Sequence, residues 1–205
     1  RRATLNFLSF LDNAISSGRV DIVLDFADVE YAGAAASVRL FAVISRAYFV
    51  KKNSNFIRFI WPKKNQNSAG HRYIVGTGLS VALTANTSAK LDQLCEEKRF
   101  FQSAVEPFIH WANTLNVLDD KALLTFDQYL LVSSALSEAM LNVSHHAYEH
   151  PSFSSVINDM EGKRWWQCCW YNAEINKIVC IIYDLGLGIH DSFTSASPLF
   201  RGYDN

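Results

Sequence analysis

Several features are scarce or absent in this sequence, and each absence excludes a class of protein. No stretch approaches the roughly 20 uncharged apolar residues that cross a bilayer, so we expect no membrane association. Lys and Arg are scattered and not gathered in one run, so we do not expect nucleic acid as a partner. The opening Arg1-Arg2-Ala3-Thr4 shows neither a signal-peptide pattern nor an initiator Met, and we expect a piece of a longer chain.

Cysteine is also scarce. The sequence holds four, at Cys95, Cys168, Cys169 and Cys180. No pair has C-x-x-C spacing, and neighbouring cysteines on a strand point to opposite faces, so we do not expect a metal site. The remaining interpretation is buried, reduced thiols in a cytoplasmic protein.

The composition of the sequence is that of a globular protein. Hydrophobic residues make up 49% of the 205 positions and charged residues 19%, which is enough apolar material for one large or two small domains. Residues 1–85 carry 11 Lys and Arg against 5 Asp and Glu, whereas residues 86–205 carry 8 against 15. The opposite signs indicate two units with different surfaces. Chance variation in solvated charges explains the same numbers equally well.

The first 85 residues have the pattern of a small α/β layer. A β-branched apolar run at 20–26 predicts a buried strand, and Ala34-Ala35-Ala36 opens a helical pattern. A second strand is predicted at 56–61. A short helix, interrupted by two glycines, is predicted over 73–83. Strand, helix, strand and helix in this order imply parallel pairing.

Two short segments of this region resemble a known family. The turn Asp25-Phe26-Ala27-Asp28-Val29-Glu30-Tyr31 and the closing Val75-Gly76-Thr77-Gly78-Leu79 resemble a STAS domain, the fold of anti-sigma-factor antagonists, over residues 1–85. Regulated members carry a phosphorylatable serine at the start of the helix, about where Ala34 stands. Because alanine has no hydroxyl, the phospho-switch of that family is not carried over to this chain.

Residues 86–94 are predicted as a linker that ends in a helix N-cap at Thr87 or Ser88. Apolar residues at helical spacing then predict one helix from Leu91 to Leu115, kinked at Pro107. A turn is predicted over 116–121.

The next helix carries candidate chemistry. An amphipathic pattern spans Thr125 to Tyr148, and Glu138, Asn142 and His146 recur at steps of four, which places them on one helix face. A carboxamide is a hard neutral ligand for Mg²⁺, and a carboxylate one turn away can orient a water or accept its proton. The alternative is a polar helix face hydrated by solvent.

A second motif follows a pair of predicted strands at 165–171 and 178–183. The second strand runs directly into Asp184-Leu185-Gly186-Leu187-Gly188-Ile189. A buried strand that delivers a carboxylate, followed by two glycines, is typical of a ligand-contacting loop, because glycine lets the backbone approach a flat base. Taken alone, this sequence segment is also compatible with an ordinary turn.

Together the two motifs resemble a family over residues 95–195. Glu138-Ala139-Met140-Leu141-Asn142, continuing through His146-Ala147, resembles the N box of the GHKL (Bergerat-fold, histidine-kinase-like) ATPases, and Asp184 to Ile189 resembles their first glycine box. The resemblance implies Glu138 as the water-activating base, Asn142 as the Mg²⁺ ligand and Asp184 as the adenine reader. The other implied ATP-binding residues are His146, Gly186, Gly188 and Ile189. The second glycine box and the lid are not recognisable between His190 and Asn205.

The two resemblances imply an α/β (α+β sandwich) fold. A STAS-like domain over 1–85 precedes a Bergerat-fold ATPase domain over 95–205. The expected function is Mg²⁺-dependent ATP binding with slow hydrolysis or phosphotransfer, acting as a nucleotide switch. The alternative is a non-catalytic, ATP-responsive interaction module. We expect a protein partner or self-association through the STAS-like domain.

Overall fold

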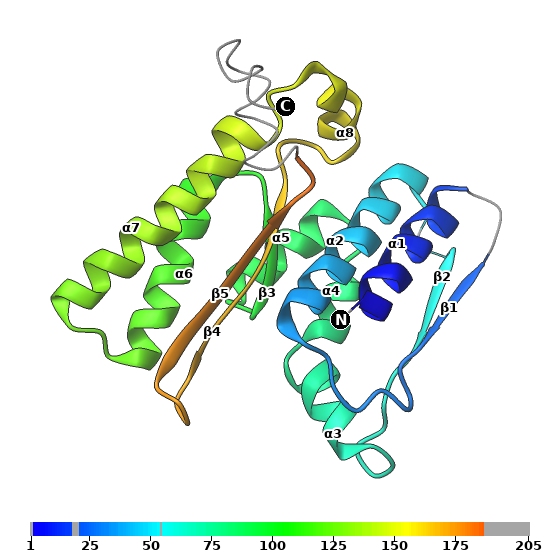
Figure 1. Ribbon diagram of the computed structural model, residues 1–205, viewed down its shortest axis with the longest axis horizontal. Helices are drawn as coiled ribbons and strands as arrows, with labels where there is room; N and C mark the ends of the chain where they lie inside the picture. The colour runs from blue at the N-terminus through cyan, green and yellow to red at the C-terminus, as the bar shows by residue number, and fades with distance from the viewer. Residues whose placement is uncertain (1, 18–20, 54, 187–205) are drawn as a thin grey trace, which may run out of the picture. The chain divides into compact units, whose positions relative to one another are not determined.

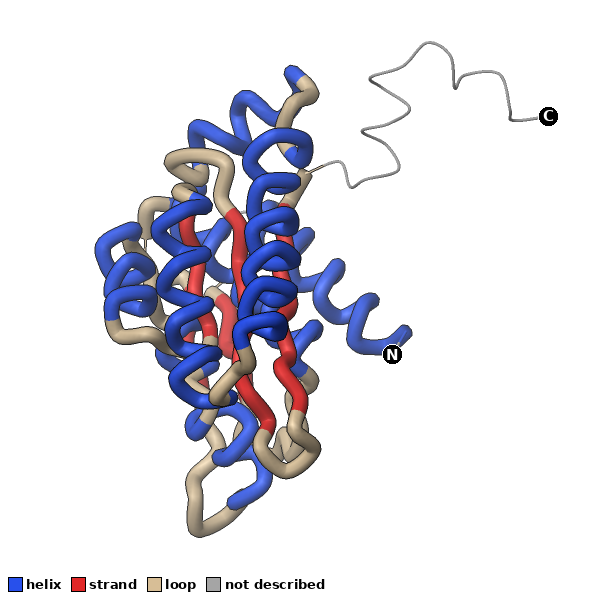
Figure 2. Tube along the Cα trace, turned by 90° about the vertical axis from the view of Figure 1, so that its left-hand side faces the viewer, coloured by secondary structure: helices blue, strands red, loops and turns tan. Residues whose placement is uncertain are grey.

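The computed structural model describes residues 2–17, 21–53 and 55–186 (Figure 1). It is a mixed α/β structure, in which helices account for most of the described chain and strands form two small sheets (Figure 2). None of the described helices is both long and apolar enough to cross a membrane.

The chain divides into two compact units. Unit 1 comprises Arg1–Ser103 and Trp166–Tyr183, and unit 2 comprises Ala104–Trp165 and Asp184–Asn205. The chain therefore passes between the units three times. Neither unit coincides with residues 1–85 or 95–205, and those domain boundaries stay a prediction.

Unit 1 contains the first half of the helices and most of both sheets. Its described helices are α1 (Arg2–Ser16), α2 (Ala34–Lys51), α3 (Ser68–Gly70), the π-helix η1 (His71–Gly76), α4 (Leu79–Leu83) and α5 (Ser88–Glu96). Its strands are β1 (Ile22–Asp25), β2 (Ile57–Ile60), β3 (Phe101–Ala104), β4 (Trp165–Asn172) and β5 (Lys177–Asp184), the last three extending by a residue into unit 2. The sheet orders are β1-β2 and β3-β4-β5.

The β1-α2-β2 arrangement confirms the predicted parallel layer. β1 and β2 pair in parallel, in a register that runs from Ile22 opposite Ile57 to Asp25 opposite Ile60. Parallel neighbours need a crossover, and α2 supplies it. The predicted 73–83 helix is present in two pieces, η1 and α4, because Gly78 adopts a left-handed conformation (φ 80°) at the start of α4.

Helix α1 is an element that the sequence analysis did not predict. Its residues Leu8, Leu11 and Ile15 are buried at helical spacing, and the helix packs against α2 within unit 1. An ion pair between Asp12 and Arg46, 3.5 Å apart, also joins the two helices. The helical spacing of these apolar residues could therefore have predicted α1 from the sequence.

The predicted single helix from 91 to 115 is wrong. Thr87 caps α5 as predicted, accepting a hydrogen bond from the Lys90 amide, but α5 ends at Glu96 and the buried strand β3 follows. Pro107 occupies the first turn of α6, where its missing N–H costs nothing, and it makes no kink. Helix α6 (Pro107–Ala122) also runs through the segment predicted as a turn.

Strands β4 and β5 confirm the two strands predicted before the glycine motif. The Cα atoms of Cys169 and Cys180 lie 4.3 Å apart, and the two cysteines form a disulfide. The expectation of reduced thiols is therefore wrong for this pair, because it took no account of which residues the strand register places opposite each other. Cys95 and Cys168 are buried and form no disulfide with a described residue, and burial raises the pKa of Cys168 to about 12.

Candidate functional site

The helix that carries Glu138 and Asn142 lies in unit 2, among the described helices of that unit. They are α6, α7 (Phe126–Asn142), the π-helix η2 (Val143–Ala147), the 3₁₀ helix η3 (Pro151–Phe153) and α8 (Ser154–Asp159). Helix α7 begins with a capping box between Thr125 and Gln128 and buries Leu136 and Met140. It packs against α6, and the Trp111 indole N–H donates to the Ser133 carbonyl over 3.0 Å.

The residues that resemble an N box lie along α7 and its π-helical continuation. Glu138 is exposed and Asn142 is half-buried, and their four-residue spacing within the α-helix keeps them on one face. His146 is exposed, with its Nδ1 3.6 Å from an oxygen of Glu149. Because His146 lies in the π-helical turn, the α-helical period that predicted its direction does not apply to it. Single π turns within helices occur frequently at functional sites.

The glycine motif begins where β5 ends. Asp184 is half-buried, and its Oδ1 accepts a hydrogen bond from the Gly186 amide over 2.8 Å, which curls the loop immediately after the strand. The other carboxylate oxygen accepts no hydrogen bond from the described part of the chain. Gly188 and Ile189, also predicted for the site, lie outside the described residues.

The structure brings this loop to the end of the helix that carries Glu138 and Asn142. The Leu185 amide donates to the hydroxyl oxygen of Tyr148 over 3.0 Å. A Cβ added to Gly186 would overlap the backbone carbonyl of Ala147, so the two backbones are as close as a glycine permits. The loop carrying Asp184 and the helix carrying Asn142 therefore belong to one local arrangement within unit 2. No hydrogen bond or ion pair joins Glu138 or Asn142 to residues 184–186 among those described.

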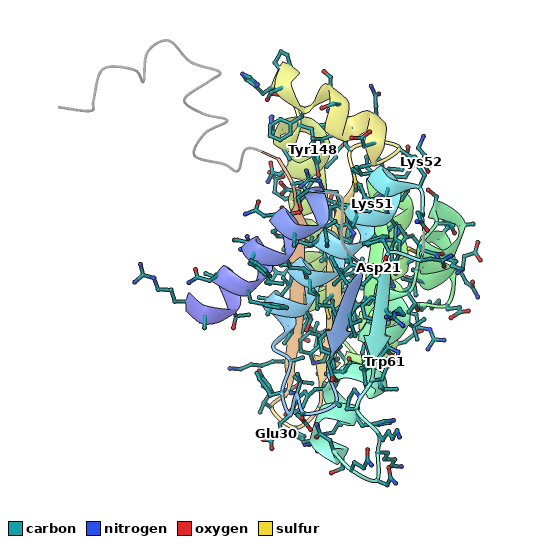
Figure 3. All side chains as sticks on the ribbon, turned by 90° about the vertical axis from the view of Figure 1, so that its right-hand side faces the viewer. Asp21, Glu30, Lys51, Lys52, Trp61 and Tyr148 are labelled. Carbon is teal, nitrogen blue, oxygen red and sulfur yellow. A yellow bond between two sulfur atoms is a disulfide. The ribbon has the colours of Figure 1, made fainter. Side chains whose placement is uncertain are left out.

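Tyr148, which Figure 3 labels, was missed at the sequence level. Its side chain is 3% exposed, and its hydroxyl donates to the Arg164 carbonyl over 2.6 Å while accepting from Leu185. A buried tyrosine hydroxyl usually has a hydrogen-bond partner. Tyr148 is the last residue of the amphipathic pattern that begins at Thr125, and this position could have identified it as a buried residue.

A second buried polar group lies in unit 2 at His110. Its ring meets Trp165 edge to face, with 5.8 Å between centroids, and its Nδ1 is buried without a hydrogen-bond partner among the described residues. Burial, with a smaller contribution from the positive charge of Arg164, lowers the pKa of His110 to about 4. His110 is therefore neutral at physiological pH.

Asn142 is the metal ligand that the resemblance implies. No group of three His, Cys, Asp or Glu side chains in the described ranges could hold a metal ion. Mg²⁺ in nucleotide sites takes only one or two protein ligands, keeps waters and binds the phosphates. Half-buried Asn142 fits such a single ligand.

Comparison with protein families, with curated proteins and with solved structures returns no match to this chain. The likeness to STAS and histidine-kinase-like domains therefore stays a resemblance of motifs. Within unit 2, the Asp184 loop contacts the helix end at Ala147 and Tyr148.

Proposed function

We propose that unit 2 binds Mg·ATP beside the Asp184 loop. The observation that carries the proposal is the contact between that loop and the end of the N-box helix, through the Leu185 amide, the Tyr148 hydroxyl and the close approach of Gly186 to Ala147. Two motifs 42 residues apart, counted from Asn142 to Asp184, thereby become neighbours in the fold. The order of the two motifs along the chain and the contact between them in unit 2 both support a nucleotide site.

Each residue has a role that its chemistry supports. The Asp184 oxygen that accepts no hydrogen bond from the described residues accepts one from the exocyclic amine of adenine, and Gly186 lets the loop pack directly against the backbone of Ala147. Asn142 binds the Mg²⁺ that accompanies the phosphates. Glu138, on the same helix face as Asn142, activates the attacking water or orients it. The result is slow hydrolysis or phosphotransfer that switches a regulatory assembly, whose protein partner binds the STAS-like residues 1–85.

One observation favours the alternative of a non-catalytic, ATP-responsive interaction module. Glu138 is exposed, and within the described ranges no side chain hydrogen-bonds to it, so nothing orients the carboxylate as a base. A general base works best when it is held in place. Ala34 at the start of α2 also removes the hydroxyl that a phosphotransfer switch of the STAS kind would use.

Replacing Asp184 by asparagine is expected to weaken ADP and ATP binding about tenfold to a hundredfold. Loss of a hydrogen bond to a charged acceptor costs about 1.5–3 kcal/mol, and the amide offers the adenine amine a poorer partner. Titration calorimetry on the full chain measures the change. Asp159→Asn, at an exposed aspartate of unit 2, is the matched control and should bind like the parent. Equal affinity of Asp184→Asn and the parent would remove Asp184 from the site.

The pair Glu138→Ala and Asn142→Ala separates catalysis from binding. We expect Glu138→Ala to abolish hydrolysis with nearly unchanged affinity, because a base lowers the barrier. Asn142→Ala should lose the Mg²⁺-dependent part of binding, because a metal ligand also acts in the ground state. Phosphate release and calorimetry with and without Mg²⁺ measure the two effects, and Glu174→Ala, in the exposed β4–β5 turn, is the control. Hydrolysis by Glu138→Ala at the parent rate would leave only the non-catalytic module.

A further inference from the structure

Tyr148 joins three separate segments of unit 2. Its hydroxyl accepts from the Leu185 amide and donates to the Arg164 carbonyl, while its backbone follows directly on η2. The side chain is buried, and its ring meets Phe153 edge to face at 5.9 Å between centroids. Burial keeps water from taking over either hydrogen bond if the hydroxyl is removed.

The Arg164 end of this connection is itself held in place. The Arg164 amide donates to the Gly162 carbonyl over 2.9 Å, and its Nε donates to the Met160 carbonyl over 3.1 Å. Lys163 ties the same segment to η2, because its Nζ donates to the Ser144 carbonyl over 2.6 Å. The Tyr148 hydroxyl therefore connects the Asp184 loop to Arg164, whose segment is itself held by hydrogen bonds to Met160, Gly162 and Ser144.

The position of the loop decides the direction of the Asp184 carboxylate. Asp184 and Leu185 are adjacent, and Asp184 Oδ1 is already engaged by the Gly186 amide. With the loop held at both Leu185 and Gly186, the remaining oxygen has one preferred direction. In a chain of hydrogen bonds, each bond polarises the next, so the bond from Leu185 is strengthened by the bond to Arg164.

We propose that Tyr148 is a positioning residue of the nucleotide site. Its hydroxyl holds the Asp184 loop so that the carboxylate meets the exocyclic amine of adenine. Tyr148 acts through Asp184 and does not touch the nucleotide. The inference rests on the proposed function of unit 2 and adds to it the residue that holds the adenine-reading carboxylate of Asp184 in place.

The test is a double-mutant cycle on the full chain with ADP and GDP as probes. Tyr148→Phe is expected to weaken ADP binding about threefold to thirtyfold, the range for losing one or two buried hydrogen bonds, and to narrow the preference for ADP over GDP. In the Asp184→Asn background the same substitution should change ADP affinity little, because its effect passes through the carboxylate. A merely structural role would weaken binding equally in both backgrounds.

Tyr171→Phe is the matched control. It removes a hydroxyl that donates to Asn176 at 2.9 Å at the exposed β4–β5 turn, and it should leave ADP affinity unchanged. Hydrogen exchange adds a readout independent of binding: the Leu185 amide should exchange faster in Tyr148→Phe than in the parent, because its acceptor is gone. In the parent, ADP should slow exchange at the same amide, and this measurement needs no variant.

The outcomes separate the inference from the function on which it rests. If the parent binds ADP, Asp184→Asn weakens it and Tyr148→Phe binds like the parent, the positioning role is overturned while the nucleotide site stands. Equal losses from Tyr148→Phe in both backgrounds also overturn it. If the parent binds no adenine nucleotide, the proposed function fails and the inference fails with it. The proposal is supported if Tyr148→Phe weakens ADP binding in the parent but not in the Asp184→Asn background. The Leu185 amide should also exchange faster in Tyr148→Phe than in the parent.

Discussion

Replacing Gly186 by alanine is expected to lower adenine-nucleotide affinity by about a hundredfold. The added Cβ would overlap the carbonyl oxygen, carbonyl carbon and Cβ of Ala147, and two of these three atoms belong to the backbone. No rotamer change relieves such an overlap, so the Asp184 loop must move away from the helix end. Overpacking of this kind costs about 1–3 kcal/mol, and the upper end corresponds to about a hundredfold in binding. Titration calorimetry with ADP measures the loss.

Gly76→Ala is the control for this substitution. A Cβ at Gly76 would have its nearest neighbour, the His71 carbonyl oxygen, at 3.6 Å, which is an ordinary contact. It should leave ADP affinity as in the parent. If Gly186→Ala bound ADP as tightly as Gly76→Ala, the close approach to Ala147 would have no part in the site.

The second large effect concerns pH and His110. The pKa of His110 is about 4 in the folded protein because burial, and then the charge of Arg164, disfavour its protonated form. In the unfolded chain, histidine has a pKa of about 6.5. Between these values the unfolded state binds more protons, so stability falls as the pH falls from about 6.5 towards 4. We expect His110 to account for a loss of about 3 kcal/mol in the free energy of unfolding between pH 7 and pH 4.

The measurement compares the parent with His110→Phe, which keeps an aromatic ring against Trp165. Urea unfolding at pH 7 and at pH 4 should show a smaller loss of stability in the variant, by about 3 kcal/mol. Taking the difference cancels the contribution of other groups that titrate in this range. His145→Phe, at an exposed histidine, should lose as much stability as the parent. Equal losses in parent and His110→Phe would show that His110 is not desolvated as the fold implies.

Elements set by neighbouring residues were predictable from sequence. The N-cap at Thr87 and the strands β1, β2, β4 and β5 all follow from patterns within a few residues. The cap forms its hydrogen bond within the same short segment, and the apolar run that predicts each strand is likewise local. The parallel pairing of β1 and β2 was also predictable, because a helix between two strands imposes it.

Elements set by distant partners were not predictable. Residues 101–104 carry apolar spacing that also suits a helix, and they form a strand because β4, about sixty residues later, pairs with them. The disulfide between Cys169 and Cys180 has the same origin, because only the strand register puts those two residues opposite each other.

The candidate site divides in the same way. The sequence by itself determined which chemical groups the proposal uses: a carboxylate, a carboxamide and two glycines in an order that resembles the N box and the first glycine box. Only the tertiary structure decided how Asp184 is held. The Tyr148 hydroxyl reaches Leu185, 37 residues away along the chain, and Gly186 meets the backbone of Ala147. Contacts between segments so far apart depend on how the chain packs, and no local pattern encodes them.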